Sequence, residues 1–271
     1  MAARVSAAAH TASLTRPATV EHLPALLHVL DASAAEAGLD DDLVFALHLA
    51  AEEACTNVIK HGYGEAPGPL TLAVEIGSRS VAVVITDEAP LFTPELAPPP
   101  PLSGSVEDRP IGGLGWHFIR EMTDEVCHEA LPGRGNRLTL IKHIPRSTSQ
   151  DVMVTDSHDL SIRITPHDEA AVAQLAGSIN TTSAGDLLDA FQGAIAKGHP
   201  RFVVDCHAVH YLSSSGLGVL LQVAKEVRPE GGDLRLAAVS PKALQVLDLS
   251  GFTTVFQLYP DVEAALASYS T

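Results

Sequence analysis

The sequence is poor in cysteine and contains no long apolar run. Its three cysteines, Cys55, Cys127 and Cys206, lie far apart in the chain. This spacing lacks the close pairs of a zinc knuckle, and the odd number argues against a framework of disulfides. A reducing cytoplasm is therefore the expected location. Because no stretch of about eighteen apolar residues occurs, no membrane-spanning helix is predicted.

The chain is also short of basic side chains. Lys and Arg together number 17 against 33 Asp and Glu, which gives a formal net charge of −16. Such a chain repels polyanions, so neither a nucleic-acid partner nor an anionic membrane surface is expected. A bound nucleotide would have to be held by local backbone donors and a metal ion.

The 271 residues are enough for two ordinary domains. The opening residues 1–16 are rich in Ala and Ser and predict a frayed tail. Apolar residues at helical spacing then predict a helix over Val20–Ala37, with Gly38 as its C-terminal stop. A second helix is predicted from the acidic residues at Asp40 to about His61.

The next segments are strands interrupted by proline and glycine. Two runs rich in β-branched residues, Leu70–Ile76 and Ser80–Thr86, predict a hairpin. The segment Pro94–Arg109 contains four consecutive prolines and is predicted to be a mobile loop. A short helix over Trp116–Thr123 and, after a turn, a strand over Arg137–His143 complete this part.

The polar segment Ile144–Asp159 has no periodicity and is the best linker candidate. Beyond it strands and helices alternate, which implies a sheet with helical crossovers. Strands are predicted at Ser161–Ile164, Ala171–Leu175, Arg201–Asp205 and Leu234–Val239, and helices at Ala184–Ala196, Ser214–Val227, Pro241–Leu249 and Pro260–Ser268.

Glu53 and Asn57 are the first candidates for chemistry. They lie four residues apart, so on a helix they project from one face and can act on one bound species. A carboxylate can accept a hydroxyl proton, while an amide oxygen suits a hard magnesium ion. The spacing alone also fits a surface helix with an acidic pair. His61, near the end of this helix, contacts phosphate or simply finishes the helix, and both alternatives stay open.

Two downstream features add to this pair. Asp87 ends a strand, where a buried carboxylate can accept the exocyclic amine of adenine. Gly112–Gly115 opens a helix, and glycines there let backbone N–H groups and the helix dipole meet phosphates. Each feature taken singly is more often an ordinary turn.

In this order, the segments over Pro17–Ile144 resemble the GHKL (Bergerat) ATP-binding fold of gyrase, Hsp90 and histidine kinases, and in particular the anti-sigma-factor serine kinases. The resemblance implies that Glu53 is the catalytic base and Asn57 the ligand of Mg²⁺. The family normally has glycine where this chain has Ala89. The remaining residues that the resemblance places around ATP are His61, Asp87, Ala89, Gly113, Leu114, Gly115 and Thr139.

Ser213, Ser214 and Ser215 precede the apolar helix of the second part. Serines in this position are first of all N-caps, but a phosphate added there would also meet the positive end of the helix. The segment resembles the Asp-Ser-Ser/Thr-Gly-Leu-Gly signature of STAS-domain anti-sigma-factor antagonists, over Asp159–Tyr269. The resemblance makes Ser214 the phosphoacceptor, with Ser213 in place of the aspartate.

These features predict a two-domain α+β and α/β chain: an ATP-binding domain over residues 17–146, a linker over 147–158 and a STAS domain over 159–271. The predicted function is partner switching, in which an ATP-dependent serine kinase phosphorylates a STAS antagonist, its own or a separate one. The expected partners are a sigma factor or other regulator and a serine phosphatase, and a homodimer is expected. The alternative is an inactive nucleotide-sensing adapter, which Ala89 and Ser213 favour.

Overall fold

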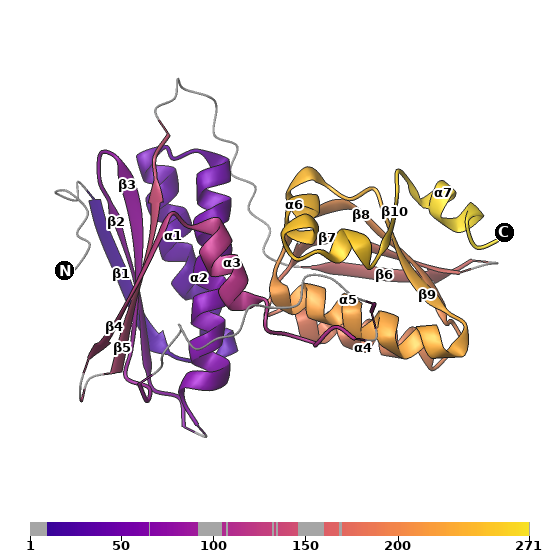
Figure 1. Ribbon diagram of the computed structural model, residues 1–271, viewed down its shortest axis with the longest axis horizontal. Coiled ribbons are helices and arrows are strands. Elements are labelled where there is room, and N and C mark those ends of the chain that lie inside the picture. The colour runs from indigo at the N-terminus through magenta and orange to yellow at the C-terminus, as the bar shows by residue number, and fades with distance from the viewer. Residues whose placement is uncertain are drawn as a thin grey trace. The chain divides into compact units, whose positions relative to one another are not determined.

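A computed structural model of the chain describes residues 10–64, 66–91, 105–106, 108–131, 133, 135–145, 160–167 and 170–270. They form two compact units, each with its own five-stranded sheet (Figure 1). The four-proline run and most of the predicted linker lie outside the described residues.

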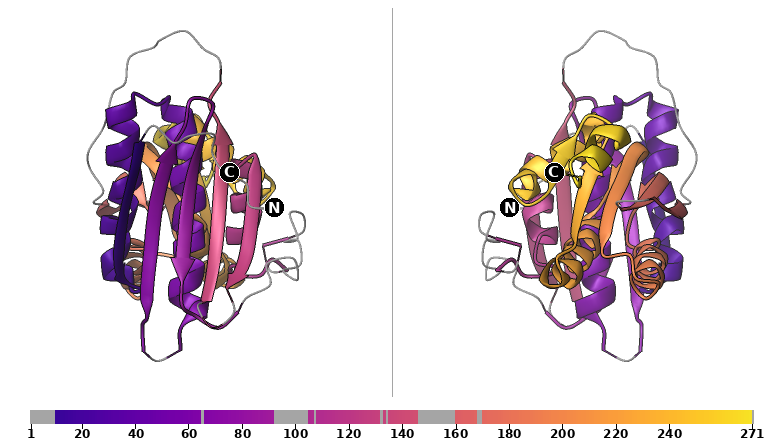
Figure 2. Two further views of the ribbon diagram at one scale, coloured as in Figure 1. Left: turned by 90° about the vertical axis from the view of Figure 1, so that its left-hand side faces the viewer. Right: turned by 90° about the vertical axis from the view of Figure 1, so that its right-hand side faces the viewer.

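The sheet of the first unit is antiparallel throughout, in the order β1-β2-β3-β5-β4. The left view of Figure 2 shows its strands facing the viewer, with the helices behind them. The predicted hairpin is confirmed. The strands are β1 (His10–Pro17), β2 (Pro69–Ile76), β3 (Ser80–Asp87), β4 (Glu125–Leu131) and β5 (Gly135–His143).

Strand β1 contradicts the frayed tail predicted for residues 1–16, in the part that the structure describes. All eight of its residues pair with β2. The side chains of His10, Ala12 and Leu14 are half-buried and alternate with exposed ones. This alternation is typical of a strand with one covered face, but small Ala and Ser residues obscured it in the sequence.

Three helices cover one face of this sheet (Figure 1). Helix α1 (Leu23–Ala37) ends at the predicted stop, Gly38, which adopts the left-handed conformation typical of a helix C-terminus. Helix α2 (Asp41–Asn57) begins at Asp40, whose carboxylate accepts the N–H groups of Asp42 and Leu43. A π-helical turn, η2 (Val58–Gly62), continues α2. Helix α3 (Gly115–Met122) packs against α2.

The second unit has a mixed sheet in the order β10-β9-β8-β7-β6. Only the β6–β7 pair is antiparallel. The three-residue β10 was not predicted, and β7 and β8 extend beyond their predicted ends. The strands are β6 (Ser161–Pro166), β7 (Ala171–Ile179), β8 (Arg201–Leu212), β9 (Asp233–Ala237) and β10 (Gln257–Tyr259).

Helices cover both faces of this sheet (Figure 1), and the predicted helical crossovers are confirmed. Helices α4 (Ala184–Ile195) and α5 (Ser214–Val227) pack together on one side. Helices α6 (Pro241–Leu249) and α7 (Val262–Ala267) cover the other. Short 3-10 turns, η4 (Arg228–Glu230) and η5 (Phe252–Thr254), follow α5 and α6.

The described residues between 105 and 114 pack with the second unit. Arg109, only 2% exposed, donates to the carbonyl oxygens of Ser250 at 2.8 Å and Gly251 at 3.0 Å. The guanidinium carbon of Arg109 lies 4.9 Å from the ring centroid of Phe252. Lys225 Nζ donates to the backbone carbonyl oxygen of Arg109 at 2.5 Å. One buried arginine therefore anchors this segment to the turn after α6.

No helix among the described residues combines the length and the apolar character that crossing a bilayer requires.

Candidate functional site

The C-terminal part of α2 places Glu53 and Asn57 one helical turn apart. Glu53 is 3% exposed, and Asn57, the last residue of the helix, is half-buried. No described residue forms a hydrogen bond with the side-chain amide of Asn57. The predicted pair therefore occupies one face of α2, with the amide available to a ligand.

Gly115, the first residue of α3, lies directly against this pair. A Cβ atom at Gly115 would be 2.8 Å from Glu53 Oε2 and 3.6 Å from both side-chain amide atoms of Asn57. Only a residue without a side chain fits here without moving the carboxylate. The start of a helix also presents N–H groups without partners in the helix, which favour an anion. The structure thus brings three predicted residues together from two helices.

Asp87 at the end of β3 forms a second polar group. It is 5% exposed, and its Oδ1 accepts the backbone N–H of Ala89 and the Nδ2 group of Asn136, each at 2.9 Å. Among the described residues, no donor reaches Oδ2. A buried carboxylate is costly without full hydrogen bonding, so Oδ2 suits the amino group of a ligand.

Asn136 is a site residue that the sequence analysis missed. It is 6% exposed and stands opposite Asp87 in the β3–β5 register. The preceding residue, Gly135, has a φ of +95°, and a Cβ atom there would lie 1.9 Å from Asp87 O. Only glycine permits this close approach, so Gly135 places Asn136 beside the carboxylate. The glycine at the start of this strand was the available signal.

The structure does not bring Thr139 to this group. Thr139 pairs with Val84, three residues along β5 from Asn136. Successive side chains point to opposite faces of a strand, so an odd offset directs Thr139 away from the face that holds Asp87 and Asn136. The strand register therefore directs Thr139 to the face opposite Asp87, and its place around ATP stays a prediction from the family resemblance.

Ala89 is 4% exposed and adopts an ordinary backbone conformation. Among the described non-glycine residues, only Ala238 has a positive φ. A Cβ atom on Gly62 would lie 3.1 Å from Ala89 Cβ, so the methyl group contacts the turn after α2. The departure from the family's glycine at this position therefore creates no backbone strain.

The other predicted site residues are neighbours of this group along the chain. His61 is exposed on the π-helical turn that follows Asn57. Gly112 and Gly113 are exposed and have φ values of +95° and +85°, which favour glycine, whereas Leu114 is buried. Gly113 and Leu114 lie next to Gly115 only because they directly precede it in the chain.

Tyr63 joins the turn after α2 to the end of β3. Its hydroxyl donates to Pro69 O and accepts the N–H of Glu88, both at 2.6 Å. Partial burial raises the pKa of Tyr63, so the hydroxyl stays protonated and able to donate. Tyr63 is a positioning residue for this loop, and the sequence analysis did not identify it.

Cys55 lies on α2 close to the site but is chemically inert. Burial, followed by the charges of Glu52 and Asp87, raises the pKa of its thiol to about 12. The thiolate that acts as a nucleophile is therefore almost absent at neutral pH. This leaves the carboxylate of Glu53 as the better candidate for proton transfer.

The three serines at the start of α5 have different environments. Ser213 is fully buried and caps α5, its hydroxyl accepting the N–H of Gly216 at 3.5 Å. Ser215 is hydrogen-bonded to Thr181 at 3.0 Å. Ser214 is half-buried on the first turn of the helix. A phosphoryl group could not reach Ser213 without breaking the cap.

Close packing fixes the position of this helix start. A Cβ atom on Gly216 would be 2.5 Å from Ile179 Cγ2 and 3.0 Å from Ile179 O. The backbone N–H of Ser213 donates to the same carbonyl oxygen at 2.9 Å. The serines are thus held against the end of β7 rather than on a loose loop.

Within the described part of the chain, no group of three or more His, Cys, Asp or Glu side chains could hold a metal ion. Magnesium usually takes few protein ligands and completes its shell with water and substrate phosphates. The side-chain amide of Asn57 beside the start of α3 fits that role.

Comparisons with known proteins divide the chain in the same way. The family described as "Histidine kinase-like ATPase domain" matches residues 16–142, and "STAS domain" matches residues 161–265. BtrW of Bordetella bronchiseptica, named a serine/threonine-protein kinase, is 31% identical over 102 residues, covering 37% of this chain and 71% of BtrW. BtrV of the same organism, named as an anti-sigma factor antagonist, is 36% identical over 104 residues, covering 38% of this chain and 90% of BtrV.

Solved structures also include similar chains. The crystal structure of an anti-sigma factor antagonist from Mycobacterium paratuberculosis is 26% identical, with a TM-score of 0.41, and the match covers 44% of this chain and all of that one.

Proposed function

We propose that this chain is an ATP-dependent protein serine kinase that phosphorylates a STAS-domain serine. Its first domain belongs to the family of anti-sigma-factor serine kinases, and its second domain belongs to the family of STAS-domain antagonists. The observation that carries this proposal is the position of Gly115, where an added Cβ atom would meet Glu53 Oε2 and lie within 4 Å of the side-chain amide of Asn57. This position supports the proposal because a carboxylate, a side-chain amide and the start of a helix lie around one point.

In this proposal the first domain binds ATP between β3 and the helices. Asp87 accepts the amino group of adenine through Oδ2, while Asn136 and the N–H of Ala89 hold Oδ1 in place. Asn57 contributes its side-chain oxygen to Mg²⁺, and the N–H groups at Gly113–Gly115 bind the phosphates. Bound magnesium would offset the charge that moves to the leaving oxygen.

The transfer step uses Glu53 as the general base. Glu53 takes the hydroxyl proton as the serine oxygen forms a bond to the γ-phosphorus, and the bond from that phosphorus to the bridging oxygen breaks to release ADP. The near-complete burial of Glu53 removes competing water from the proton acceptor. Positioning of the hydroxyl then determines most of the rate.

Ser214 is the proposed acceptor, on this chain or on another copy. It stands at the family's phosphoacceptor position and is half-buried on the first turn of α5, whereas Ser213 is the fully buried cap. A phosphate there adds a charge of about −1.5 to −2 at the positive end of α5. It would change the partner surface without breaking the cap.

The remaining assignments follow from the family. We assign residues 17–146, together with strand β1 (His10–Pro17), to the kinase domain, 147–158 to the linker and 159–271 to the STAS domain, in a homodimer in the cytoplasm. The partners are a sigma factor or other regulator, which the unphosphorylated STAS domain releases, and a serine phosphatase that restores Ser214. A nucleotide-sensing adapter is the alternative, but neither Ala89, which is unstrained, nor Ser213, which is a cap, favours it.

Incorporation of labelled phosphate from Mg-[γ-³²P]ATP tests the proposal. We expect incorporation by the purified full chain to fall about 100-fold or more in Glu53→Gln, which keeps the shape but removes the base. Glu121→Gln, the same change at an exposed residue of α3, is the matched control and should retain full activity. ATP binding without any incorporation in the native chain would refute the kinase and support the adapter.

A further inference from the structure

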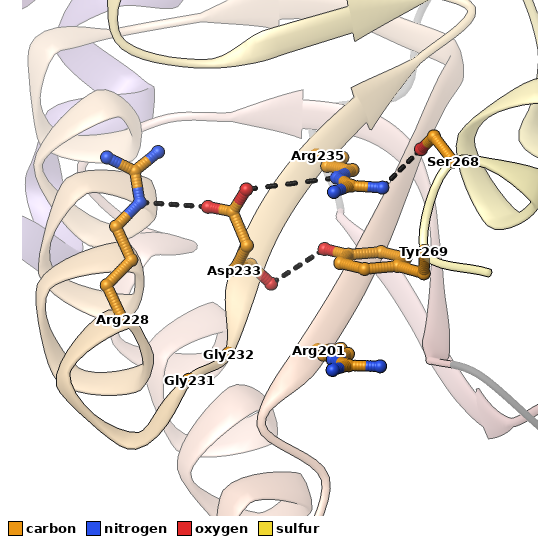
Figure 3. Close-up of a pocket in the computed structure, with 8 residues that line it drawn as sticks. All are labelled: Arg201, Arg228, Gly231, Gly232, Asp233, Arg235, Ser268 and Tyr269. Carbon is orange, nitrogen blue, oxygen red and sulfur yellow. Dashed lines mark hydrogen bonds and ion pairs between the residues drawn. The ribbon is translucent and has the colours of Figure 1, made fainter. Parts of the chain in front are cut away.

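A polar cavity lies in the STAS domain, at the end of the sheet where β8 and β9 begin. It has a volume of about 410 Å³, and its lining includes Arg201, Arg228 and Arg235 (Figure 3). Cavities of this size hold small organic molecules. The sequence analysis did not single out any of these residues.

The arginines are concentrated here against the charge of the rest of the chain. Residues 159–271 contain four arginines, and three of them line this cavity; the fourth is Arg163. The whole chain has a formal charge of −16. A random distribution of few basic residues over an acidic protein does not favour three around one cavity, so the arrangement calls for a local explanation.

Two of the guanidinium groups are held by Tyr269. The guanidinium carbon of Arg235 lies 3.6 Å from the ring centroid of Tyr269, and that of Arg201 lies 5.7 Å away. Figure 3 shows the ring lying between the two side chains. Tyr269 is itself tied to the ends of the strands, because its hydroxyl reaches Phe202 O at 3.0 Å and Asp233 O at 2.9 Å. The positive groups are thus preorganised rather than loose on the surface.

The arginines are only partly neutralised. Asp233 is the acidic residue of the cavity, 2.8 Å from Arg228 Nε and 3.8 Å from Arg235 Nε. Arg201 has no acidic partner within 4.0 Å among the described residues. The buried Nε of Arg235 likewise makes no hydrogen bond with the described residues, although Arg235 also donates to Ser268.

The charge of the cavity is therefore close to +2, from three guanidinium groups and one carboxylate. Tyr269 does not reduce it, since burial raises the pKa of its hydroxyl and keeps the ring neutral. A phosphomonoester carries about −1.5 to −2 at pH 7, and its oxygens match the fork of a guanidinium group.

We propose that the cavity lined by Arg201, Arg228 and Arg235 binds a small phosphate-bearing anion, either free phosphate or a phosphomonoester. This site is separate from the phosphoacceptor. Arg201 begins β8, and Ser214 follows its other end, so the two are about 35 Å apart along an extended strand. The proposal does not rest on the kinase function, because the site needs neither ATP nor Glu53.

The test is an NMR titration of the full chain, labelled with ¹⁵N-arginine and free of ATP, at pH 8 and constant ionic strength. Inorganic phosphate is added in one arm and ribose 5-phosphate in the other, and the Nε–Hε signals are followed. We expect the signals of Arg201, Arg228 and Arg235 to shift together along one saturating curve. Tighter binding of ribose 5-phosphate would identify an organic ligand, and equal binding would identify free phosphate.

Variants make the result specific. Arg201→Gln should weaken binding about tenfold or more, because it removes a charge-assisted contact. Arg163→Gln, which removes the same charge from an exposed position of β6, should leave the affinity unchanged. Arg201→Lys retains the charge, should recover part of the affinity, and covers the case in which Arg201→Gln does not fold. Absence of any shift at tens of millimolar phosphate, or equal loss in Arg163→Gln, would overturn the proposal.

Discussion

Replacing Gly115 by alanine separates the stability of the first domain from its chemistry. The new Cβ atom would lie 2.8 Å from Glu53 Oε2, about 0.6 Å short of the 3.4 Å at which ordinary contact begins. The atom it meets is the far end of a flexible side chain, so the carboxylate can move aside at little cost. Alanine is also the better helix former, by up to about 1 kcal/mol. The thermal midpoint should therefore stay the same or rise slightly.

Activity should respond in the opposite direction. A displacement of about 1 Å in a catalytic group can cost about 100-fold in rate, so a shift of roughly half that size should cost about tenfold. The assay is the single-turnover rate of phosphate transfer from Mg-ATP at saturating nucleotide, measured beside the thermal midpoint. A fall in rate with a retained midpoint assigns the effect to the position of Glu53.

Gly193→Ala is the matched control. Gly193 lies in α4 and is exposed, and a Cβ atom added there would have no neighbour within 4 Å among the described residues. The same chemical change there should stabilise its helix and leave the transfer rate unchanged. If Gly115→Ala transfers phosphate as fast as the native chain, then Gly115 and Glu53 do not form the catalytic contact.

Two further predictions concern Asn136 and His48. Asn136→Ala should raise the Kd for ATP and lower the free energy of unfolding by about 1–3 kcal/mol, because it removes a buried partner of Asp87. Nucleotide titration measures the Kd, and chemical denaturation measures the free energy of unfolding. Thr139→Val, on the opposite face of β5, should leave the Kd unchanged, and an equal rise in Kd in the two variants would contradict the strand register. Burial lowers the pKa of His48, but the 2.9 Å hydrogen bond and the charge of Asp31 outweigh it and raise the pKa overall. His48→Gln should therefore destabilise the chain most below about pH 6.5, with the difference shrinking as the pH rises through the raised folded-state pKa; a difference that grows with pH would refute this.

Local patterns predicted the elements that hold most of the site. The helical spacing of apolar residues and Gly38 identified α1 and α2, and the four-residue spacing of Glu53 and Asn57 placed both on one face. These features depend on neighbours along the chain, so the sequence displays them directly. The distinction among the serines needed the structure, because the cap bond of Ser213 depends on the fold around it.

Non-local pairing accounts for the errors. Strand β1 forms only because β2, more than fifty residues later, supplies its hydrogen bonds. Asn136 was overlooked, and Thr139 named instead, because the face to which a strand residue points depends on the pairing register. Residues three apart on a strand point to opposite faces. The arginine cavity likewise joins residues from β8, η4, β9 and the C-terminal end, and no short motif connects them.

The most direct test of the kinase assignment is to locate the phosphate by mass spectrometry after the purified chain has been incubated with Mg-ATP. We predict one phosphate per chain at Ser214, none at Ser213 or Ser215, and none at any of the three in Glu53→Gln. A range of protein concentrations would show whether transfer occurs within one chain, at a constant rate, or between chains. An unmodified Ser214 in a chain that binds ATP, or a phosphate on the buried cap Ser213, would contradict the account.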